Sequence, residues 1–297
     1  MQAKSGVHAL QMDLACISVH TGVSLIELYQ FVRQGDRHYR TFRIPKKSGG
    51  FRKIQAPSVS LKIVQRWIGT TLLGSLPLAD ACTGYRKGQS IVSNAAPHAN
   101  AGFVFNVDIE RFFPSITAAR VKELFESLGY NSKTAGQLTA LTTVNGVLPQ
   151  GAPSSPQIAN LICARLDERL EQFAARHGFA YTRYCDDITI SGTGNFRPRQ
   201  RTVFDIIESE GFAVNHSKVR LAYRGQRQEV TGLVVNSFVN LPRERRRLIR
   251  AMVHRFGAGE CERWDDMVLS TRMHGQLSYL KMVRPADRLL KNAANGQ

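Results

Sequence analysis

Three stretches of the chain repeat apolar residues at the three- and four-residue spacing of a helix that is buried on one face. The first spans residues 10–32, with a break expected near Gly22, and the second spans residues 58–73. The third follows Pro156 and ends at Gly178. This spacing predicts helices that pack their apolar stripes into a core.

Other segments have the alternation of a strand. Residues 40–57 predict a hairpin around a Ser48-Gly49-Gly50 turn. Residues 103–108 predict a strand whose last residue is a carboxylate. Residues 181–191 predict two short strands that meet at Cys185-Asp186-Asp187. Strands and helices in this order predict an α+β fold, with helices on one side of the sheet.

The composition describes a globular chain with a large positive charge. Hydrophobic residues make up 43% of the 297 residues, which excludes a wholly disordered chain. Forty Lys and Arg against 23 Asp and Glu leave a net charge of +17, which favours nucleic acid or an anionic membrane as partner. No stretch approaches the ~18 uninterrupted apolar residues of a membrane span, and no secretory leader is expected. Five cysteines without a Cys-x-x-Cys pair predict neither a disulfide framework nor a zinc site, and fit a reducing, cytosolic location.

The charge is uneven along the chain. Basic clusters at residues 33–53 and 243–255 flank Asp108 and the Asp186-Asp187 pair. Hard divalent cations such as magnesium take carboxylate oxygens and leave positions open for phosphates. Two such ions activate an attacking hydroxyl and stabilise a leaving pyrophosphate. An aspartate pair alone is weak evidence for such a site, because aspartates are common in turns that only face water.

Four blocks of sequence resemble motifs of the reverse transcriptases, and they follow one another along the chain in that family's order. Tyr184-Cys185-Asp186-Asp187 resembles their Tyr-x-Asp-Asp signature, and Phe105-Asn106-Val107-Asp108-Ile109 resembles the strand with their other catalytic Asp. Residues 148–156 resemble their Pro-Gln-Gly loop before a helix, and residues 44–54 resemble the fingers hairpin that holds the triphosphate. The resemblance covers residue 40 to about residue 236. It implies a right-hand polymerase of fingers, palm and thumb, with an antiparallel palm sheet packed on helices.

Two further strings resemble the retron reverse transcriptases. Asn94-Ala95-Ala96-Pro97-His98 matches their Asn-Ala-x-x-His motif, and Val230-Thr231-Gly232 matches their Val-Thr-Gly triplet. The resemblance divides the chain into N-terminal helices and fingers (1–100), a palm with interleaved fingers segments (101–236) and a basic helical thumb (237–297). After residue 236 we expect room for a thumb and no ribonuclease H, maturase or endonuclease domain.

The resemblance implies a catalytic centre with two Mg²⁺ ions. Asp108, Asp186 and Asp187 would be the catalytic residues, and the metal positions would be these three together with Ile109. Phe113 lies where the family places a bulky side chain beneath the incoming sugar, so its ring would exclude a 2′-hydroxyl. The alternative is that Phe113, like its neighbour Phe112, belongs to the core.

The resemblance also implies which residues bind the deoxynucleotide. Lys46 and Arg52 would pair with the β- and γ-phosphates, with Lys46 or Lys47 as the lysine, unless this hairpin is simply solvated. Gln150 and Gly151 would lie under the nascent base pair, where glycine lets the backbone approach the nucleotide. Lys218 would donate a proton to the leaving pyrophosphate or make one more phosphate contact.

RNA contacts are expected at two places. Asn94 and His98 would take part in RNA recognition or make a structural hydrogen bond. An arginine-rich helix is expected to open after Pro242, with its basic side facing a nucleic-acid backbone or, alternatively, solvent. Its arginines are Arg243, Arg245, Arg246, Arg247 and Arg250.

The resemblance implies an enzyme that copies part of a structured non-coding RNA into DNA from deoxynucleoside triphosphates. Priming from a 2′-hydroxyl of a guanosine in that RNA would give branched RNA-linked DNA (msDNA). The expected partners are the cognate RNA and its DNA product, a retron effector protein and a host ribonuclease H that removes the template, with no membrane. The expected setting is the bacterial cytoplasm and a retron system that defends against phage.

Two alternatives stay open at this point. One is a reverse transcriptase of the group II intron or abortive-infection type, against which the two retron strings argue. The other is a non-catalytic RNA-binding scaffold that has kept a polymerase palm, against which the intact Asp108, Asp186 and Asp187 argue.

Overall fold

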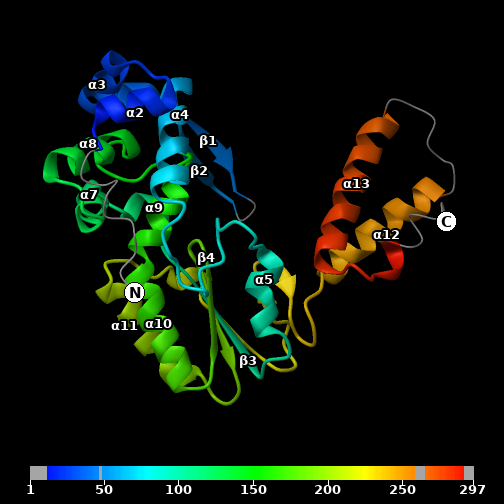
Figure 1. Ribbon diagram of the computed structural model, residues 1–297. Helices are drawn as coiled ribbons and strands as arrows, with labels where there is room; N and C mark the ends of the chain where they lie inside the picture. Colours follow the sequence, from blue (N-terminus) through cyan, green and yellow to red (C-terminus); the bar gives the residue numbers. More distant parts are fainter. Residues whose placement is uncertain (1–11, 47–48, 258–264, 291–297) are drawn as a thin grey trace.

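A four-stranded antiparallel sheet lies at the centre of the structure, with its strands in the order β4-β5-β3-β6 (Figure 1). The computed structural model describes residues 12–46, 49–257 and 265–290. The strands are β3 (Phe103–Asp108), β4 (Ala180–Tyr184), β5 (Asp187–Gly192) and β6 (Arg220–Tyr223). Because β3 pairs with a strand on each side, neighbours on both sides hold it in place.

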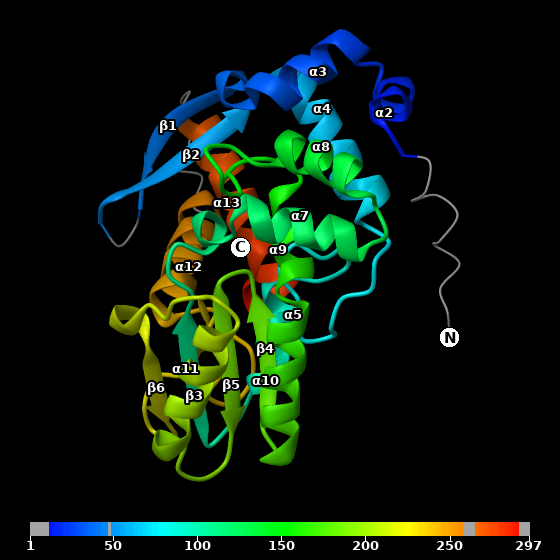
Figure 2. The ribbon, with the colours of Figure 1, turned by 90° about the vertical axis from the view of Figure 1, so that its left-hand side faces the viewer.

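Helices cover one face of the sheet, where every second side chain of β3 and β5 is apolar. Phe103, Phe105 and Val107 of β3 and Ile188 and Ile190 of β5 are buried in the main core. Figure 2 shows α10 and α11 lying over this face. The helices of this group are α9 (Ser155–Ile162), α10 (Ala164–Arg176) and α11 (Gln200–Ser209).

The opposite face is covered as well, so the expectation of helices on one side only is wrong. α5 (Ile91–Ala95) lies on this face, opposite α10 and α11, and continues into η3 (Ala96–His98) (Figures 1 and 2). The reason is that Val104, on the face of β3 opposite Phe103, is as fully buried as Phe103. Val104 shares a second core with α5 and with the hairpin of β7 (Glu229–Val230) and β8 (Leu233–Val234).

The N-terminal part of the chain forms a helical group from which a hairpin extends. Figure 2 shows β1 and β2 reaching out beyond the helices, and most side chains of the hairpin are exposed. The helices are α2 (Leu14–Thr21), α3 (Leu25–Gln34), η1 (Gly35–His38), α4 (Val59–Trp67), the π-helical turn η2 (Ile68–Leu72), α7 (Ala118–Ser127) and α8 (Ser132–Thr142). The hairpin consists of β1 (Tyr39–Pro45) and β2 (Phe51–Pro57), which pair antiparallel.

A pair of helices, α12 (Arg243–Gly257) and α13 (Asp265–Val283), stands to one side of the sheet (Figure 1). Ile249 of α12 and Leu280 of α13 are fully buried and share the second core with Val230 and Leu233 of the β7–β8 hairpin. This core joins the helix pair to the sheet. Three short elements complete the described chain: α6 (Phe112–Ser115), η4 (Arg197–Arg199) and η5 (His216–Lys218).

The apolar patterns predicted most elements correctly. The helical stretch predicted at residues 10–32 corresponds to α2 and α3, with residues 10 and 11 outside the described residues. The chain breaks between them at Gly22, where φ is +70°, a conformation that glycine adopts without strain. The predicted hairpin, the strand ending at Asp108 and the two strands around Cys185-Asp186 are confirmed, although Ser48 of the hairpin turn lies outside the described residues. The single helix expected after Pro156 is instead two helices, α9 and α10, which meet at Cys163.

In the described part of the chain, no single helix is long and apolar enough to cross a membrane. α2 and the segment 25–38 taken together have the length and the apolar composition of a membrane span, but they are bent by 120° relative to each other. Leu14, Ile17 and Leu28 of this pair are buried in the main core.

Candidate active site

Three carboxylates from distant parts of the chain meet at one end of the sheet. Asp108 is the last residue of β3 and pairs in register with Asp187, the first residue of β5. Asp186 lies in the turn between β4 and β5, and its carbonyl oxygen accepts a hydrogen bond of 2.9 Å from the backbone N–H of Ile109. The pairing of β3 with β5 therefore makes neighbours of the three carboxylates that the sequence singled out.

These carboxylates crowd negative charge into a partly buried place. Burial, and then the charges of Asp186 and Asp108, raise the pKa of Asp187 to about 7. Burial, and then the charge of Asp108, also raise the pKa of Asp186, while Lys218 and Arg52 act in the opposite direction. Raised pKa values of this kind indicate negative charge that the protein compensates only in part and that a cation would stabilise.

Residues after α11 hold Asp108. The Nζ atom of Lys218 donates to both carboxylate oxygens of Asp108 at 2.9 Å, and about half of the lysine side chain is exposed. The backbone N–H of Asn215 donates to the Asp108 carbonyl oxygen at 2.9 Å. The sequence predicted that Lys218 gives a proton to the leaving pyrophosphate or contacts a phosphate, and in the structure its ammonium lies on the Asp108 carboxylate. Asn215 belongs to the same sequence block, and its contact with Asp108 was not foreseen.

The side chains at this end of the sheet suit a hard divalent cation. Asp108, Asp186 and Asp187 offer the carboxylate oxygens that magnesium prefers. Among the described residues, no group of three or more His, Cys, Asp or Glu side chains already has the arrangement of a metal site. Lys218 supplies the positive charge beside Asp108. The side chain of Ile109 is apolar and buried, so only the backbone of this residue has an oxygen to offer.

A pocket of about 240 Å³ opens beside the carboxylates. Thr231 and Gly232 of the Val-Thr-Gly segment line this pocket, so the segment lies beside the carboxylates. The sequence motif alone did not predict this position. Across the pocket, Arg220 donates to Glu229 at 3.1 Å. The lining residues are Asn106, Val107, Asp108, Asp187, Lys218, Arg220, Glu229, Thr231 and Gly232.

The β1–β2 hairpin directs positive charge toward the same place. Arg52 of β2 is exposed, and its charge acts on Asp186 to lower the pKa of that carboxyl. Lys46 is also exposed, and its backbone N–H donates to the carbonyl oxygen of Gly50 at 3.0 Å, which closes the hairpin. Lys47 lies outside the described residues.

The loop with Gln150 and Gly151 docks onto this hairpin. The Gln150 carbonyl oxygen accepts a hydrogen bond of 2.9 Å from the backbone N–H of Gln55 in β2. Gly151 has φ +123°, and a Cβ atom there would lie 2.9 Å from Cγ2 of Ile54. Glycine is therefore required for the loop to pack on β2, a reason separate from the close approach of a nucleotide that the sequence predicted.

Phe113 lies between the core and the catalytic turn. It is 8% exposed, and its ring centroid lies 6.5 Å from that of Tyr85. Burial, and then the neighbouring Cys185 of the turn, raise the pKa of the Tyr85 hydroxyl. Phe112 packs against Phe113 and Phe212, with ring centroids 5.3 and 6.0 Å apart. Both phenylalanines belong to the main core, and Phe113 is the one whose ring also lies near Tyr85.

Asn94 and His98 are fully buried and bonded to protein, so direct RNA contact by these side chains is corrected to a structural role. Asn94 Oδ1 accepts from the Thr83 hydroxyl at 2.6 Å. The two ring nitrogens of His98 lie 2.7 Å from Ser191 Oγ and 2.8 Å from Thr182 Oγ1. The structural hydrogen bond, left open by the sequence, is the interpretation that fits. Loss of either side chain should therefore destabilise the fold and affect every activity of the protein alike.

The ionisation of His98 gives a pH-dependent test of this role. Burial lowers the pKa of His98 to about 4 from 6.5, so between these pH values the unfolded chain binds a proton that the folded chain does not. The free energy of unfolding should therefore fall as pH decreases through this range, and His98→Gln should flatten that dependence. Urea unfolding at pH 7 and pH 5 measures it, and equal pH dependence in both proteins would contradict the buried, neutral histidine.

The arginines of α12 fall into two groups. Arg243, Arg247 and Arg250 are exposed. Arg245 donates to Gln276 of α13 at 2.9 Å and lies over the Tyr279 ring, while Arg246 forms an ion pair with the buried Asp287. The expectation of a phosphate contact is corrected for Arg245 and Arg246, because they tie α12 to the segment 276–287.

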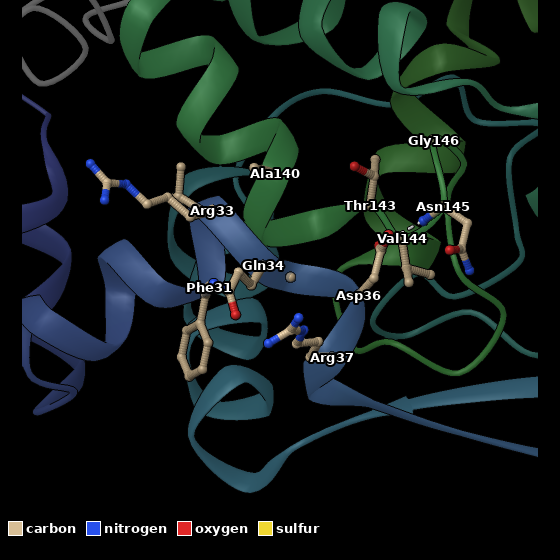
Figure 3. Close-up of a pocket in the computed structure, with 12 residues that line it drawn as sticks. Phe31, Arg33, Gln34, Asp36, Arg37, Ala140, Thr143, Val144, Asn145 and Gly146 are labelled. Atoms are coloured by element: carbon tan, nitrogen blue, oxygen red, sulfur yellow. Dashed lines mark hydrogen bonds between the residues drawn. The ribbon is translucent and has the colours of Figure 1, made fainter.

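A larger pocket of about 400 Å³ lies away from the carboxylates, between the end of α3 with η1 and the loop after α8 (Figure 3). The exposed Arg33 and Arg37 line it. Its carboxylate, Asp36, accepts a hydrogen bond of 2.9 Å from the backbone N–H of Asn145. With a single carboxylate that already has a partner, this pocket does not suit two-metal chemistry, and we place the candidate active site at the smaller pocket.

Comparison with known proteins agrees with the geometry. A family model described as reverse transcriptase (RNA-dependent DNA polymerase) matches residues 44–241. The retron Ec86 reverse transcriptase of Escherichia coli is 39% identical over 253 residues, covering 84% of this chain and 79% of that protein. The retron Mx65 reverse transcriptase of Myxococcus xanthus is 38% identical over 300 residues, covering 93% of this chain and 69% of that protein. A solved telomerase from Candida albicans, at 12% identity and a TM-score of 0.49 over 87% of this chain and 59% of that chain, is too distant to add to this.

Proposed function

The chain belongs to the reverse transcriptases of the retron type, and from this we propose that it copies part of a structured non-coding RNA, starting from a 2′-hydroxyl of that RNA. It is an RNA-directed DNA polymerase that uses an RNA template and nucleotide substrates. The product would be branched RNA-linked DNA (msDNA). The observation that carries the proposal is the meeting of Asp108, Asp186 and Asp187 beside a pocket that Thr231 and Gly232 also line.

We assign the regions of a right-hand polymerase to the described elements. The β1–β2 hairpin and the N-terminal helices, within residues 1–100, are the fingers. Residues 101–236 are the palm, with α7 and α8 as interleaved fingers segments, since α8 packs against α3 and α4, and α7 packs against α8. Residues 237–297 are the thumb, which α12 and α13 form.

In the proposed mechanism, Asp108, Asp186 and Asp187 hold two Mg²⁺ ions. Bound there, the ions would activate the attacking hydroxyl and stabilise the leaving pyrophosphate. Thr231 and Gly232, which line the pocket beside Asp108 and Asp187, would border the sugar that carries the hydroxyl. The half-exposed Lys218 has the length and freedom to leave Asp108 and give a proton or a hydrogen bond to the pyrophosphate.

The hairpin and the loop beneath it would bind the deoxynucleotide. Arg52 and Lys46, both exposed, would contact the β- and γ-phosphates, Arg52 with its planar fork. Gln150 and Gly151 would support the nascent base pair from the loop docked on β2. Phe113 would exclude a 2′-hydroxyl on the incoming sugar.

The exposed arginines of α12 give a prediction about RNA binding. Changing Arg243, Arg247 and Arg250 together to Gln should weaken RNA binding, because three phosphate contacts are lost. The slope of log affinity against log salt should decrease by about two units. Fluorescence anisotropy with a labelled RNA at several salt concentrations measures both effects.

A matched control lies on the other side of the sheet. Arg165, Arg169 and Arg201 are paired with Glu210, Asp205 and Glu208, so changing these three to Gln removes the same charge from a different surface. An equal change in the salt slope for both triple variants would show that α12 has no special contact with RNA.

The proposed setting is the bacterial cytoplasm, within a retron system that acts against phage alongside an effector protein. A host ribonuclease H would remove the copied template. These proposals follow from the similarity of the chain to retron reverse transcriptases. An infection assay with and without the gene tests the defence role. Equal phage growth in both strains would contradict it.

A primer-extension assay tests the enzymatic core of the proposal. The purified chain should extend a DNA primer on an RNA template in the presence of Mg²⁺ and deoxynucleoside triphosphates, because reverse transcriptases depend on divalent metal. A scaffold with a polymerase palm would bind the RNA and extend nothing. Chelation of Mg²⁺ by excess EDTA should stop extension while leaving RNA bound.

A further inference from the structure

Directly before the catalytic turn, β4 carries the arginine Arg183, which is fully buried. Among the fully buried side chains of the described residues, it is the only arginine in the group of the largest by volume. A guanidinium is costly to remove from water, and it is found in a protein interior only where charge and hydrogen bonds compensate. The partners of this side chain therefore indicate what it is there to hold.

Each of the five hydrogen-bond donors of Arg183 has an acceptor. Nε and one terminal nitrogen donate to the two carboxylate oxygens of Asp167 in α10, at 2.7 and 2.6 Å. That terminal nitrogen also lies 3.2 Å from Cys82 Sγ. The other donates to Asn160 Oδ1 at 3.1 Å and to the carbonyl oxygen of Cys185 at 3.0 Å. Residues of α9 and α10 thus anchor the guanidinium, and the nitrogen that binds Asn160 also binds the turn.

The turn needs such support. Cys185 has φ +61°, a left-handed conformation in which a residue with a Cβ atom is strained and persists only when its surroundings hold it. The carbonyl oxygen that Arg183 binds belongs to the peptide bond between Cys185 and Asp186. The orientation of this peptide plane fixes where the Asp186 side chain begins.

The segment Ala81–Gly84 closes the turn from its other side. The backbone N–H of Arg183 donates to Ala81, and the N–H of Thr83 donates to Arg183, at 2.8 and 3.0 Å. A Cβ atom at Gly84 would lie 2.5 Å from the backbone nitrogen of Cys185, so only glycine fits against the turn. The Nδ2 atom of Asn160 donates to the Gly84 carbonyl oxygen at 2.9 Å, which ties this segment to the same network.

From these contacts we infer that Arg183, anchored by Asp167 and Asn160, is a positioning residue that orients the Asp186 carboxylate through the Cys185–Asp186 peptide. Arg183 touches neither substrate nor metal, because it has no exposed surface. A pair of apolar residues could fill the same space at little cost in stability, so the buried charges are retained for the contact with the turn. The inference rests on the proposed role of Asp186 in metal binding.

The main test is the double variant Arg183→Met with Asp167→Asn. It leaves no unpaired buried charge, and the side-chain carbonyl introduced by Asp167→Asn can still accept the hydrogen bond that the Tyr181 hydroxyl donates to Asp167. The kcat for DNA synthesis should fall about 100-fold through misplacement of the carboxylate, while the KM for deoxynucleotides stays the same. Mn²⁺ binding without substrates, followed by electron paramagnetic resonance, should weaken about tenfold.

Two further variants make the result decisive. Arg183→Lys keeps the charge beside Asp167, and thus the fold, but lacks the fork that also reaches Cys185, so its kcat and Mn²⁺ affinity should fall too. Cys82→Ala removes a contact of the terminal nitrogen that does not bind Cys185 and leaves the backbone hydrogen bonds of Ala81 and Thr83 unchanged, so it should keep wild-type kcat and Mn²⁺ affinity.

Wild-type kcat and Mn²⁺ affinity in folded Arg183→Lys, or in the folded double variant, would overturn the inference. If both variants lose kcat but bind Mn²⁺ as the wild type does, Arg183 has only a general structural role and the inference also fails. Asp186→Asn separates this from failure of the proposed function. Full DNA synthesis by Asp186→Asn would refute the metal role itself, whereas its loss with unaffected Arg183 variants refutes the positioning alone.

Discussion

Replacing Asp186 by Asn is expected to reduce DNA synthesis by about 10³-fold or more, because several kcal/mol of transition-state stabilisation depend on the ions that this carboxylate would hold. The side chain lies in the turn beside Asp108 and Asp187, where its negative charge helps to raise the pKa of Asp187. RNA affinity should stay within about two-fold, because the basic surface that binds phosphates is unchanged. Single-nucleotide incorporation and RNA binding by anisotropy measure the two effects.

Asp205→Asn is the matched control. Asp205 is an exposed aspartate of α11, paired with Arg201, and has no contact with the candidate site. This variant makes the same chemical change and should keep wild-type synthesis. Wild-type synthesis by Asp186→Asn, or an equal loss in both variants, would rule out the assignment of Asp186.

The second large effect is expected at Phe113. Changing it to Val should remove the ring that excludes a 2′-hydroxyl and improve the use of ribonucleotides relative to deoxynucleotides by about 100-fold. Valine is chosen because Phe113 is nearly buried, and the larger cavity left by alanine would cost roughly 3–5 kcal/mol of stability. The ratio of kcat/KM for a ribonucleotide and its deoxynucleotide is the measurement.

Phe112→Val separates selectivity from stability. Phe112 is also buried, but it packs on Phe212 in the core. It should lower stability like Phe113→Val and leave the ratio of the two substrates unchanged. If this kcat/KM ratio is unchanged in Phe113→Val, or changes equally in both variants, Phe113 does not select the sugar and serves only as a core residue.

The sequence predicted the elements that carry the carboxylates, because the signals for them are local. Alternation over residues 103–108 and over 181–191 predicted the strands, and the motif spacing placed an aspartate at the end of one and in the turn of the other. What the pattern could not contain is the register of β3 against β5, which sets Asp108 opposite Asp187.

Residue roles were harder to predict where the deciding partner is distant in sequence. Asn94 and His98 suggested a recognition motif. The partners of His98, however, are Ser191 and Thr182, which lie on strands far from the motif in sequence. In the same way, the sequence of α12 does not distinguish Arg246 from Arg247. Only the packing of the segment 284–287 against α12 gives Arg246 the buried partner Asp287.

Burial on both faces also escaped the sequence analysis. Val104 alternates with Phe103 and Phe105 along the strand, and an apolar residue at this position is a local sign of a second covered face. Arg183 was overlooked for a related reason. A charged residue inside a strand suggests a solvent-facing position, and the chain offers no local sign that Asp167 and Asn160 converge on it.

The nucleic acid that copurifies with the chain, expressed from its own locus, tests the central claim most directly. We expect DNA joined to RNA through a 2′–5′ bond, which a debranching enzyme releases, in preparations of the wild type. The Asp186→Asn protein should carry the same RNA without DNA. DNA whose size does not change on debranching, or branched DNA on the Asp186→Asn protein, would contradict the account.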